Sequence, residues 1–160
     1  MPKAPLAVLA CAALALGCGE KEESATPSAA GAIADGDEIC RAAQERISEL
    51  RAGAPATRRE AIELTRGIIA AFEDEIAKLR ALDVPPDLEA DLDRYLAARE
   101  RSLEPLRDGL AAAEQSDEAA YAEAQAAVAG GQVERTRLAA AVGFSECSKP
   151  VGSGTGGGGG

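Results

Sequence analysis

Hydrophobic residues recur at three- and four-residue spacing along four stretches of the chain, which is the pattern of amphipathic α-helices. The first helix is predicted from Asp37 to about Ala52, with Asp35 or Asp37 as its N-cap. The second begins behind Thr57-Arg58-Arg59-Glu60, a capping box in which two side chains satisfy each other's backbone amides, and is predicted to reach Leu82. These two stretches therefore predict neighbouring helices joined by a short link.

The second half of the chain predicts two more helices, and no strand is indicated. Pro85-Pro86 marks the start of the third helix, because a residue before proline avoids helical dihedral angles. Pro105 lies inside this helix and is expected to kink it or split it. The fourth helix is predicted to have Ser116 as its N-cap, a soft point at Gly130-Gly131 and its end at Gly143.

A separate signal stands at the N-terminus. An apolar run from Ala4 to Leu16 follows Lys3, and it is too short for a membrane span, which needs roughly 20 apolar residues. The run ends in Ala15-Leu16-Gly17-Cys18, which resembles the lipobox of bacterial lipoproteins, although that pattern prefers leucine and then a small residue in the first two places. The resemblance implies a signal peptide over residues 1–17 and a lipid on Cys18. The alternative is ordinary secretion with Cys18 as a free thiol.

The remaining cysteines bear on the fold. With Cys11 removed with the signal peptide and Cys18 lipidated, Cys40 and Cys147 remain, and two cysteines in an exported chain most often pair. Four helices joined by short links predict an all-α up-down four-helix bundle, in which the two ends that carry Cys40 and Cys147 lie together. We therefore expect one disulfide to close the bundle. The alternative is two buried free thiols.

The chain divides into four parts on this interpretation. Residues 1–17 are the signal peptide, and residues 18–34 are predicted to be a lipidated cysteine with a flexible tether, since they are charged and lack hydrophobic periodicity. Residues 35–147 form the predicted bundle domain. Residues 148–160 end in a glycine run and are predicted to be a disordered tail.

The amino-acid composition excludes several classes of function. The chain holds 27 acidic and 17 basic residues, for a net charge of −10, and it contains no histidine. An acidic protein does not attract nucleic acid. Without histidine, Ser/His and Cys/His catalysis and most zinc sites are excluded. We therefore predict a protein that is not an enzyme, with no cofactor, no metal site and no nucleic-acid partner.

One polar layer interrupts the apolar stripes of the predicted helices. A helical wheel places Glu75, Arg99 and Arg135 in the stripes of the second, third and fourth helices, at one level and with Tyr95 close by. Two guanidiniums at one level could form a pocket for a carboxylate or phosphate. The structural interpretation, which we favour from the sequence alone, is that the long side chains reach solvent or that an ion pair fixes helix register.

Three features of the predicted bundle resemble a group of proteins. An early cysteine, the Leu-x-x-Leu-x-x-Pro-Pro turn from Leu79 to Pro86 and the closing Gly-Phe-x-x-Cys from Gly143 to Cys147 resemble small secreted or lipid-anchored helical proteins of actinobacteria. The resemblance implies an exported helical protein. It assigns no activity and no functional residues.

The sequence therefore predicts an extracytoplasmic lipoprotein, anchored to the cell membrane by its N-terminal lipid. Its predicted role is that of a non-enzymatic binding module, with an envelope protein as possible partner. The alternative is a lipoprotein that binds a small anion or a metal through the layer of Glu75, Arg99 and Arg135.

Overall fold

The computed structural model describes residues 27–149, and within them the chain forms six α-helices and no strand. In chain order the helices are α1 (Ala29–Leu50), α2 (Arg58–Arg80), α3 (Pro86–Arg101), α4 (Leu103–Gln115), α5 (Glu118–Gly130) and α6 (Gln132–Val142). The all-α prediction is confirmed. None of these helices combines the length and apolar character that a membrane span requires. The predicted signal peptide, Cys18 and the tail from residue 150 lie outside the described residues.

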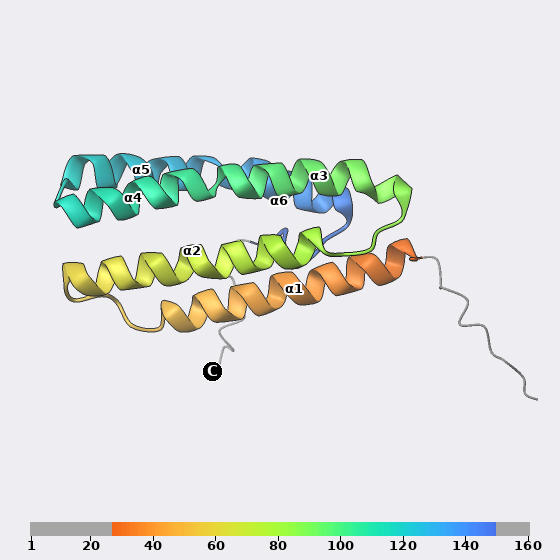
Figure 1. The fold of residues 1–160 in the computed structure, drawn as a ribbon, viewed down its shortest axis with the longest axis horizontal. Coiled ribbons are helices and arrows are strands. Elements are labelled where there is room, and N and C mark those ends of the chain that lie inside the picture. The colour runs from red at the N-terminus through yellow and green to blue at the C-terminus, as the bar shows by residue number, and fades with distance from the viewer. Residues whose placement is uncertain (1–26, 150–160) are drawn as a thin grey trace, which may run out of the picture.

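The helices pack along their lengths into a helical bundle (Figure 1). α1 lies along α2, and α2 in turn packs on α3 and α4. At one end of the molecule α4 lies along α5, and at the other end α3 lies along α6. α3 leads almost in line into α4, and α5 into α6. All six helices therefore share one interior.

The predicted start of the first helix is wrong. α1 begins at Ala29, and its N-cap is Ser28, whose hydroxyl accepts a backbone hydrogen bond from the first turn. Residues 29–34, which were predicted to belong to the tether, are therefore helical. The buried positions of this first part of α1 include Ala32 and Gly36, small residues that hydropathy patterns do not mark as a helix face.

Asp37 caps a different segment from the one predicted. Its two carboxylate oxygens accept hydrogen bonds from the hydroxyl of Ser145 at 2.7 Å and from the backbone amide of Glu146 at 2.8 Å. Close by, Gly36 leaves room for the ring of Phe144, because a Cβ at Gly36 would overlap that ring. The small and acidic residues of α1 thus hold the C-terminal turn in place.

The predicted capping box at the start of α2 is confirmed. Thr57 Oγ1 accepts from the Glu60 amide at 3.2 Å, and the Glu60 carboxylate accepts from the Thr57 amide at 3.3 Å. The helix ends at Arg80, slightly before the predicted Leu82.

Proline fixes both ends of α3. The helix begins at Pro86, as predicted, and it ends at a break centred on Ser102. Pro105 lies in the first turn of α4. Because proline has no N–H to donate to the carbonyl of Arg101, the helix is interrupted just before it. The predicted split at Pro105 is confirmed.

The boundaries of α5 and α6 correct one prediction and confirm two. Asp117, and not Ser116, is the N-cap of α5, since its carboxylate accepts from the Ala120 amide at 3.0 Å. Ser116 instead ends α4 with a left-handed φ of 62°. The predicted weak point at Gly130-Gly131 is confirmed, because Gly131 separates α5 from α6. Gly143 ends α6 with a φ of 102°, a conformation that glycine adopts without strain.

The predicted cysteine pair is confirmed. Cys40 and Cys147 are joined at disulfide distance, with their Cα atoms 5.2 Å apart, inside the usual range of about 4.4–6.8 Å. The predicted disorder from residue 148 is wrong for its first two residues, Ser148 and Lys149. The Ser148 hydroxyl donates to the Phe144 carbonyl, and Lys149 pairs with Glu146 at 2.5 Å. The rest of that tail lies outside the described residues.

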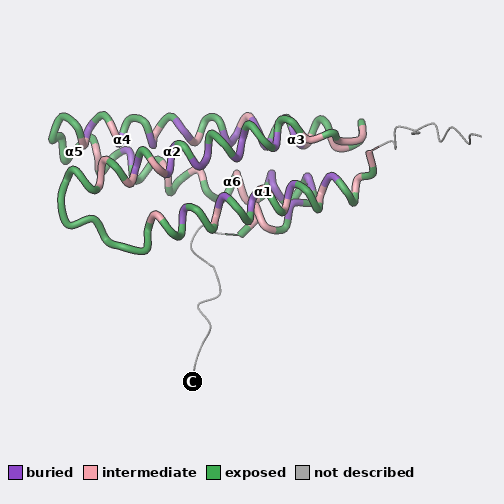
Figure 2. Tube along the Cα trace, turned by 60° about the horizontal axis from the view of Figure 1, so that its bottom comes forward, coloured by how far each residue is buried: buried purple, intermediate pink, exposed green. Residues whose placement is uncertain are grey.

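The apolar core is concentrated near the disulfide. The largest fully buried side chains include Tyr95, Phe144, Ile47, Leu79 and Val142, and the rings of Tyr95 and Phe144 meet edge to face at 6.0 Å. Figure 2 shows these buried positions along the inner sides of the helices. α5 buries only Ala124. Large side chains therefore fix one end of the bundle, and small ones pack the other.

Removing the disulfide should destabilise the protein strongly. The bond joins residues 107 positions apart, and loss of such a cross-link typically costs about 2–5 kcal/mol. We expect the Cys40→Ala/Cys147→Ala variant to unfold at lower urea concentration than wild type. Reductant should lower the wild-type midpoint and leave that of the double variant unchanged. Equal midpoints for both proteins would contradict this account.

Candidate functional site

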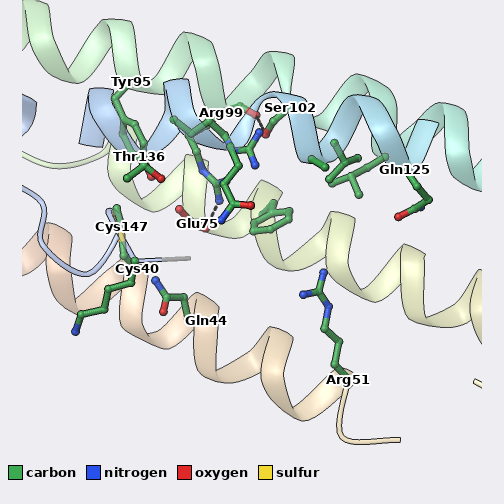
Figure 3. A pocket seen from close by; sticks show the side chains of 17 residues that line it. Cys40, Gln44, Arg51, Glu75, Tyr95, Arg99, Ser102, Gln125, Thr136 and Cys147 are labelled. Atoms are coloured by element: carbon green, nitrogen blue, oxygen red, sulfur yellow. Dashed lines mark hydrogen bonds and ion pairs between the residues drawn. A yellow bond between two sulfur atoms is a disulfide. The ribbon is translucent and has the colours of Figure 1, made fainter. Parts of the chain in front are cut away.

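A cavity of about 270 Å³ lies inside the bundle beside the disulfide. All six helices contribute side chains to its lining, as does the C-terminal turn (Figure 3). Its wall includes Cys40, Cys147 and the predicted polar residues Glu75, Tyr95, Arg99 and Arg135. The predicted layer is therefore inside the protein and faces a hollow.

Glu75 of α2 and Arg99 of α3 form a buried ion pair. Their side chains are only 5 % and 7 % exposed, and Nη2 of Arg99 donates to Oε2 of Glu75. The Arg99 guanidinium also lies over the ring of Phe72, with 4.4 Å between Cζ and the ring centroid. A cation over an aromatic face gains electrostatic attraction that is largest where water is excluded. Phe72 therefore holds the guanidinium flat at the cavity wall.

Tyr95 completes this group from the same helix as Arg99. The four-residue spacing places both side chains on one face of α3, and Tyr95 lies in the same cavity wall as Glu75. Burial raises the pKa of Tyr95 well above its ordinary value. The hydroxyl consequently stays protonated and acts as a donor.

One donor of Arg99 is left without a partner. Its Nε–H is buried, and no hydrogen-bond acceptor among residues 27–149 reaches it. A buried donor without an acceptor costs about 1–3 kcal/mol, so native proteins seldom keep one without a reason. This nitrogen has less than 1 Å² of accessible surface, so it is the rest of the Arg99 side chain that lines the cavity.

Arg135 brings a second guanidinium to the cavity from α6. It is half-buried, and within residues 27–149 it has no ion-pair partner. Burial, and then the nearby charge of Arg99, lower the pKa of Arg135. Two cations therefore approach each other across the hollow, and a negative charge between them would relieve their repulsion.

The cavity is positively charged, whereas the whole chain is acidic. Its ionisable lining comprises four cationic side chains and one carboxylate, that of Glu75, in a protein of net charge −10. Two of the cations, Arg51 and Lys149, lie exposed at the rim. Anions are therefore drawn toward this hollow and repelled by much of the remaining surface.

The structure brings together the four residues that the sequence singled out, and it adds others. The favoured expectation that long side chains would reach solvent is wrong for Arg99, whereas the expected pairing with Glu75 is correct. Sequence reasoning missed the stacking of Arg99 on Phe72 and the polar neighbours Gln132 and Thr136. Gln132 and Thr136 flank Arg135 on α6, a helix whose apolar face is too weak to reveal which side points inward.

The same wall contains a group of metal-ligand types. The sulfurs of Cys40 and Cys147 and a carboxylate oxygen of Glu75 lie within 4.8 Å of one another. The sulfurs are bonded to each other, however, and Glu75 is paired with Arg99. Metal coordination by cysteine requires the thiolate. In its disulfide form this group does not offer one.

Comparison of the chain with protein-family models, with curated proteins and with solved structures finds no match. The function must therefore be argued from the site itself.

Glu75 gives the stability of the fold a distinctive pH dependence. Burial raises the pKa of Glu75 above its ordinary value of 4.5, and the charge of Arg99 opposes this shift only in part. The folded state then binds the proton more tightly than the unfolded state. The free energy of unfolding contributed by this group is highest below the ordinary pKa and falls as the pH rises through the raised value.

Glu75→Gln should remove this contribution, since glutamine does not titrate. We expect the variant to gain stability relative to wild type as the pH is raised from about 4.5. Urea unfolding at a series of pH values measures the difference. Glu63→Gln, at an exposed position of the same helix, controls for the loss of one negative charge. A difference between Glu75→Gln and wild type that does not change with pH would refute the assignment.

Proposed function

We propose that the protein is an extracytoplasmic lipoprotein that binds a small anion in the cavity between Arg99 and Arg135. The observation that carries this proposal is a hollow of about 270 Å³ lined by two guanidiniums, of which Arg99 is paired with Glu75 and Arg135 has no ion-pair partner among the described residues. That volume lies just below the range of about 300–1,000 Å³ typical of pockets for drug-sized ligands. A small molecule is therefore the fitting occupant.

The chemistry of the cavity favours an anion over a neutral or cationic ligand. Guanidinium groups offer only donors, and they bind carboxylate and phosphate oxygens by strong charge-assisted hydrogen bonds. Glu75 already neutralises one of the two inner guanidiniums. The charge of Arg135 remains to be balanced by a ligand.

Binding is proposed in preference to catalysis. The chain has no histidine to act as general base near neutral pH. The Tyr95 hydroxyl is held protonated by burial, and Cys40 and Cys147 are bonded to each other. The groups in the cavity are thus suited to holding a ligand and offer no activated nucleophile.

The up-down arrangement of the helices is also a proposal. We infer an up-down four-helix bundle in which α3 with α4 forms one arm and α5 with α6 another. The packing of α1 on α2, of α2 on α4, of α4 on α5 and of α3 on α6 supports it. Inter-residue distances measured by NMR on the full chain test this arrangement, and long distances between α3 and α6 would contradict it.

The anchor is proposed from the sequence. The resemblance of Ala15-Leu16-Gly17-Cys18 to a lipobox supports a lipid on Cys18 and a place on the outer face of the membrane. We expect wild type in the membrane fraction of expressing cells and Cys18→Ala outside it. Identical fractionation would contradict lipidation. Cross-linking in the same cells tests the alternative role, binding to an envelope protein, which predicts a partner that is lost with the anchor.

The binding function is tested by calorimetric titration with acetate and inorganic phosphate. Arg135→Gln should weaken anion binding by about 10- to 100-fold, because a hydrogen bond to a charged group contributes about 1.5–3 kcal/mol. Arg137→Gln removes the same charge from an exposed position of α6 and should bind as wild type does. Binding that is absent in wild type, or equally weakened in both variants, would overturn the proposal.

A further inference from the structure

The charges of the inner layer of the cavity set the charge of its ligand. Glu75 carries one negative charge, and Arg99 and Arg135 carry one positive charge each, so the inner layer has one positive charge in excess. A single negative charge balances it. A dianion would leave an uncompensated charge in a partly desolvated site, which is costly.

The free donors set the shape of the ligand's head group. The Glu75 carboxylate engages Nη2 of Arg99, and the N–H groups of Nη1 have no hydrogen-bond acceptor among the described residues. Arg135 brings its guanidinium to the same hollow from α6, which packs on α3. A planar carboxylate has two oxygens, one for each of these residues.

The far part of the cavity is lined by apolar side chains beside the amide of Gln125. Beyond the charged layer the hollow extends along α4 and α5, toward Gln125 in Figure 3. Leu106, which is buried, and Val128, which is partly buried, line this part. Their side chains make no hydrogen bonds, so they fit a hydrocarbon body and not a second polar group.

Gly131 sets the position of Arg135. A Cβ at Gly131 would lie 2.7 Å from Nη1 of Arg135, so the guanidinium folds back over the break between α5 and α6. The neighbouring Gly130 has open space at the same point. A methyl group at Gly131 would therefore push away the end of a flexible side chain without disturbing the core.

We propose that the ligand is a monocarboxylate with a short apolar body. Its carboxylate lies between the guanidiniums of Arg99 and Arg135, and its hydrocarbon part lies against Leu106 and Val128. Gly131 acts as a positioning residue, because it lets Arg135 reach the carboxylate. This inference rests on the proposed anion-binding function and specifies the ligand class.

The test is calorimetric titration of the full-length protein in detergent with hexanoate, acetate, inorganic phosphate and hexylamine. Hexanoate should bind at least about tenfold more tightly than acetate, since each buried methylene adds to the affinity. It should also bind more tightly than phosphate, and hexylamine should not bind. Saturation with hexanoate should raise the melting temperature.

Two matched pairs of variants locate the ligand. Gly131→Ala should weaken hexanoate and acetate alike by about tenfold, and Gly130→Ala should not. Val128→Ser should weaken hexanoate and leave acetate unchanged, and Val133→Ser, at a side chain 79 % exposed, should do neither. If Gly131→Ala lowers the melting temperature of the ligand-free protein, Arg135→Gln gives the same comparison without a change in the backbone.

The outcomes distinguish a failure of this inference from a failure of the proposed anion-binding function. Acetate and hexanoate of equal affinity, tighter binding of phosphate, or unchanged affinity in Gly131→Ala where Arg135→Gln binds more weakly would overturn this inference and leave anion binding between Arg99 and Arg135 in place. Unchanged affinity in Arg135→Gln would overturn the proposed site as well. Failure of every anion to bind would overturn the proposed function itself.

Discussion

The buried ion pair of Glu75 and Arg99 is the interaction on which the rest of the site depends. Two charges are removed from water here, and their attraction offsets that cost only because other contacts assist them. Phe72 supports one face of the guanidinium, and Tyr95 lies in the same wall of the cavity. α2 and α3 are thereby held in one register. With Arg99 fixed in this way, the directions of its remaining N–H groups are fixed as well.

The C-terminal turn forms another part of the cavity wall. Phe144 fits over Gly36, and Asp37 accepts two hydrogen bonds from the residues that follow Phe144. Gln44 adds a third contact, donating to the Glu146 carbonyl at 2.6 Å. The disulfide is therefore one of several links between α1 and the end of the chain. Together they give the cavity a wall that no helix of the bundle could supply alone.

The sequence was sufficient to predict those features of the fold that depend on contacts between residues close together in the chain. The capping box at Thr57 and the break before Pro105 depend on backbone groups a few residues away, and both were predicted. The start of α1 was missed because small residues such as Gly36 carry no hydropathy signal, although they pack closely. A helical wheel located Arg99 on an inner face. It could not show the stacking on Phe72 or the cavity, because both depend on side chains from separate helices.

The charge of Arg135, which has no ion-pair partner among the described residues, also links occupancy to folding. A ligand that binds only the folded state stabilises it in proportion to the logarithm of its concentration. When the pocket is filled as proposed, the empty protein is the less stable form and unfolds more often. Proteases of the cell envelope degrade unfolded chains and would therefore remove empty molecules first. The amount of the protein would then follow the supply of its proposed ligand, without any change in its synthesis.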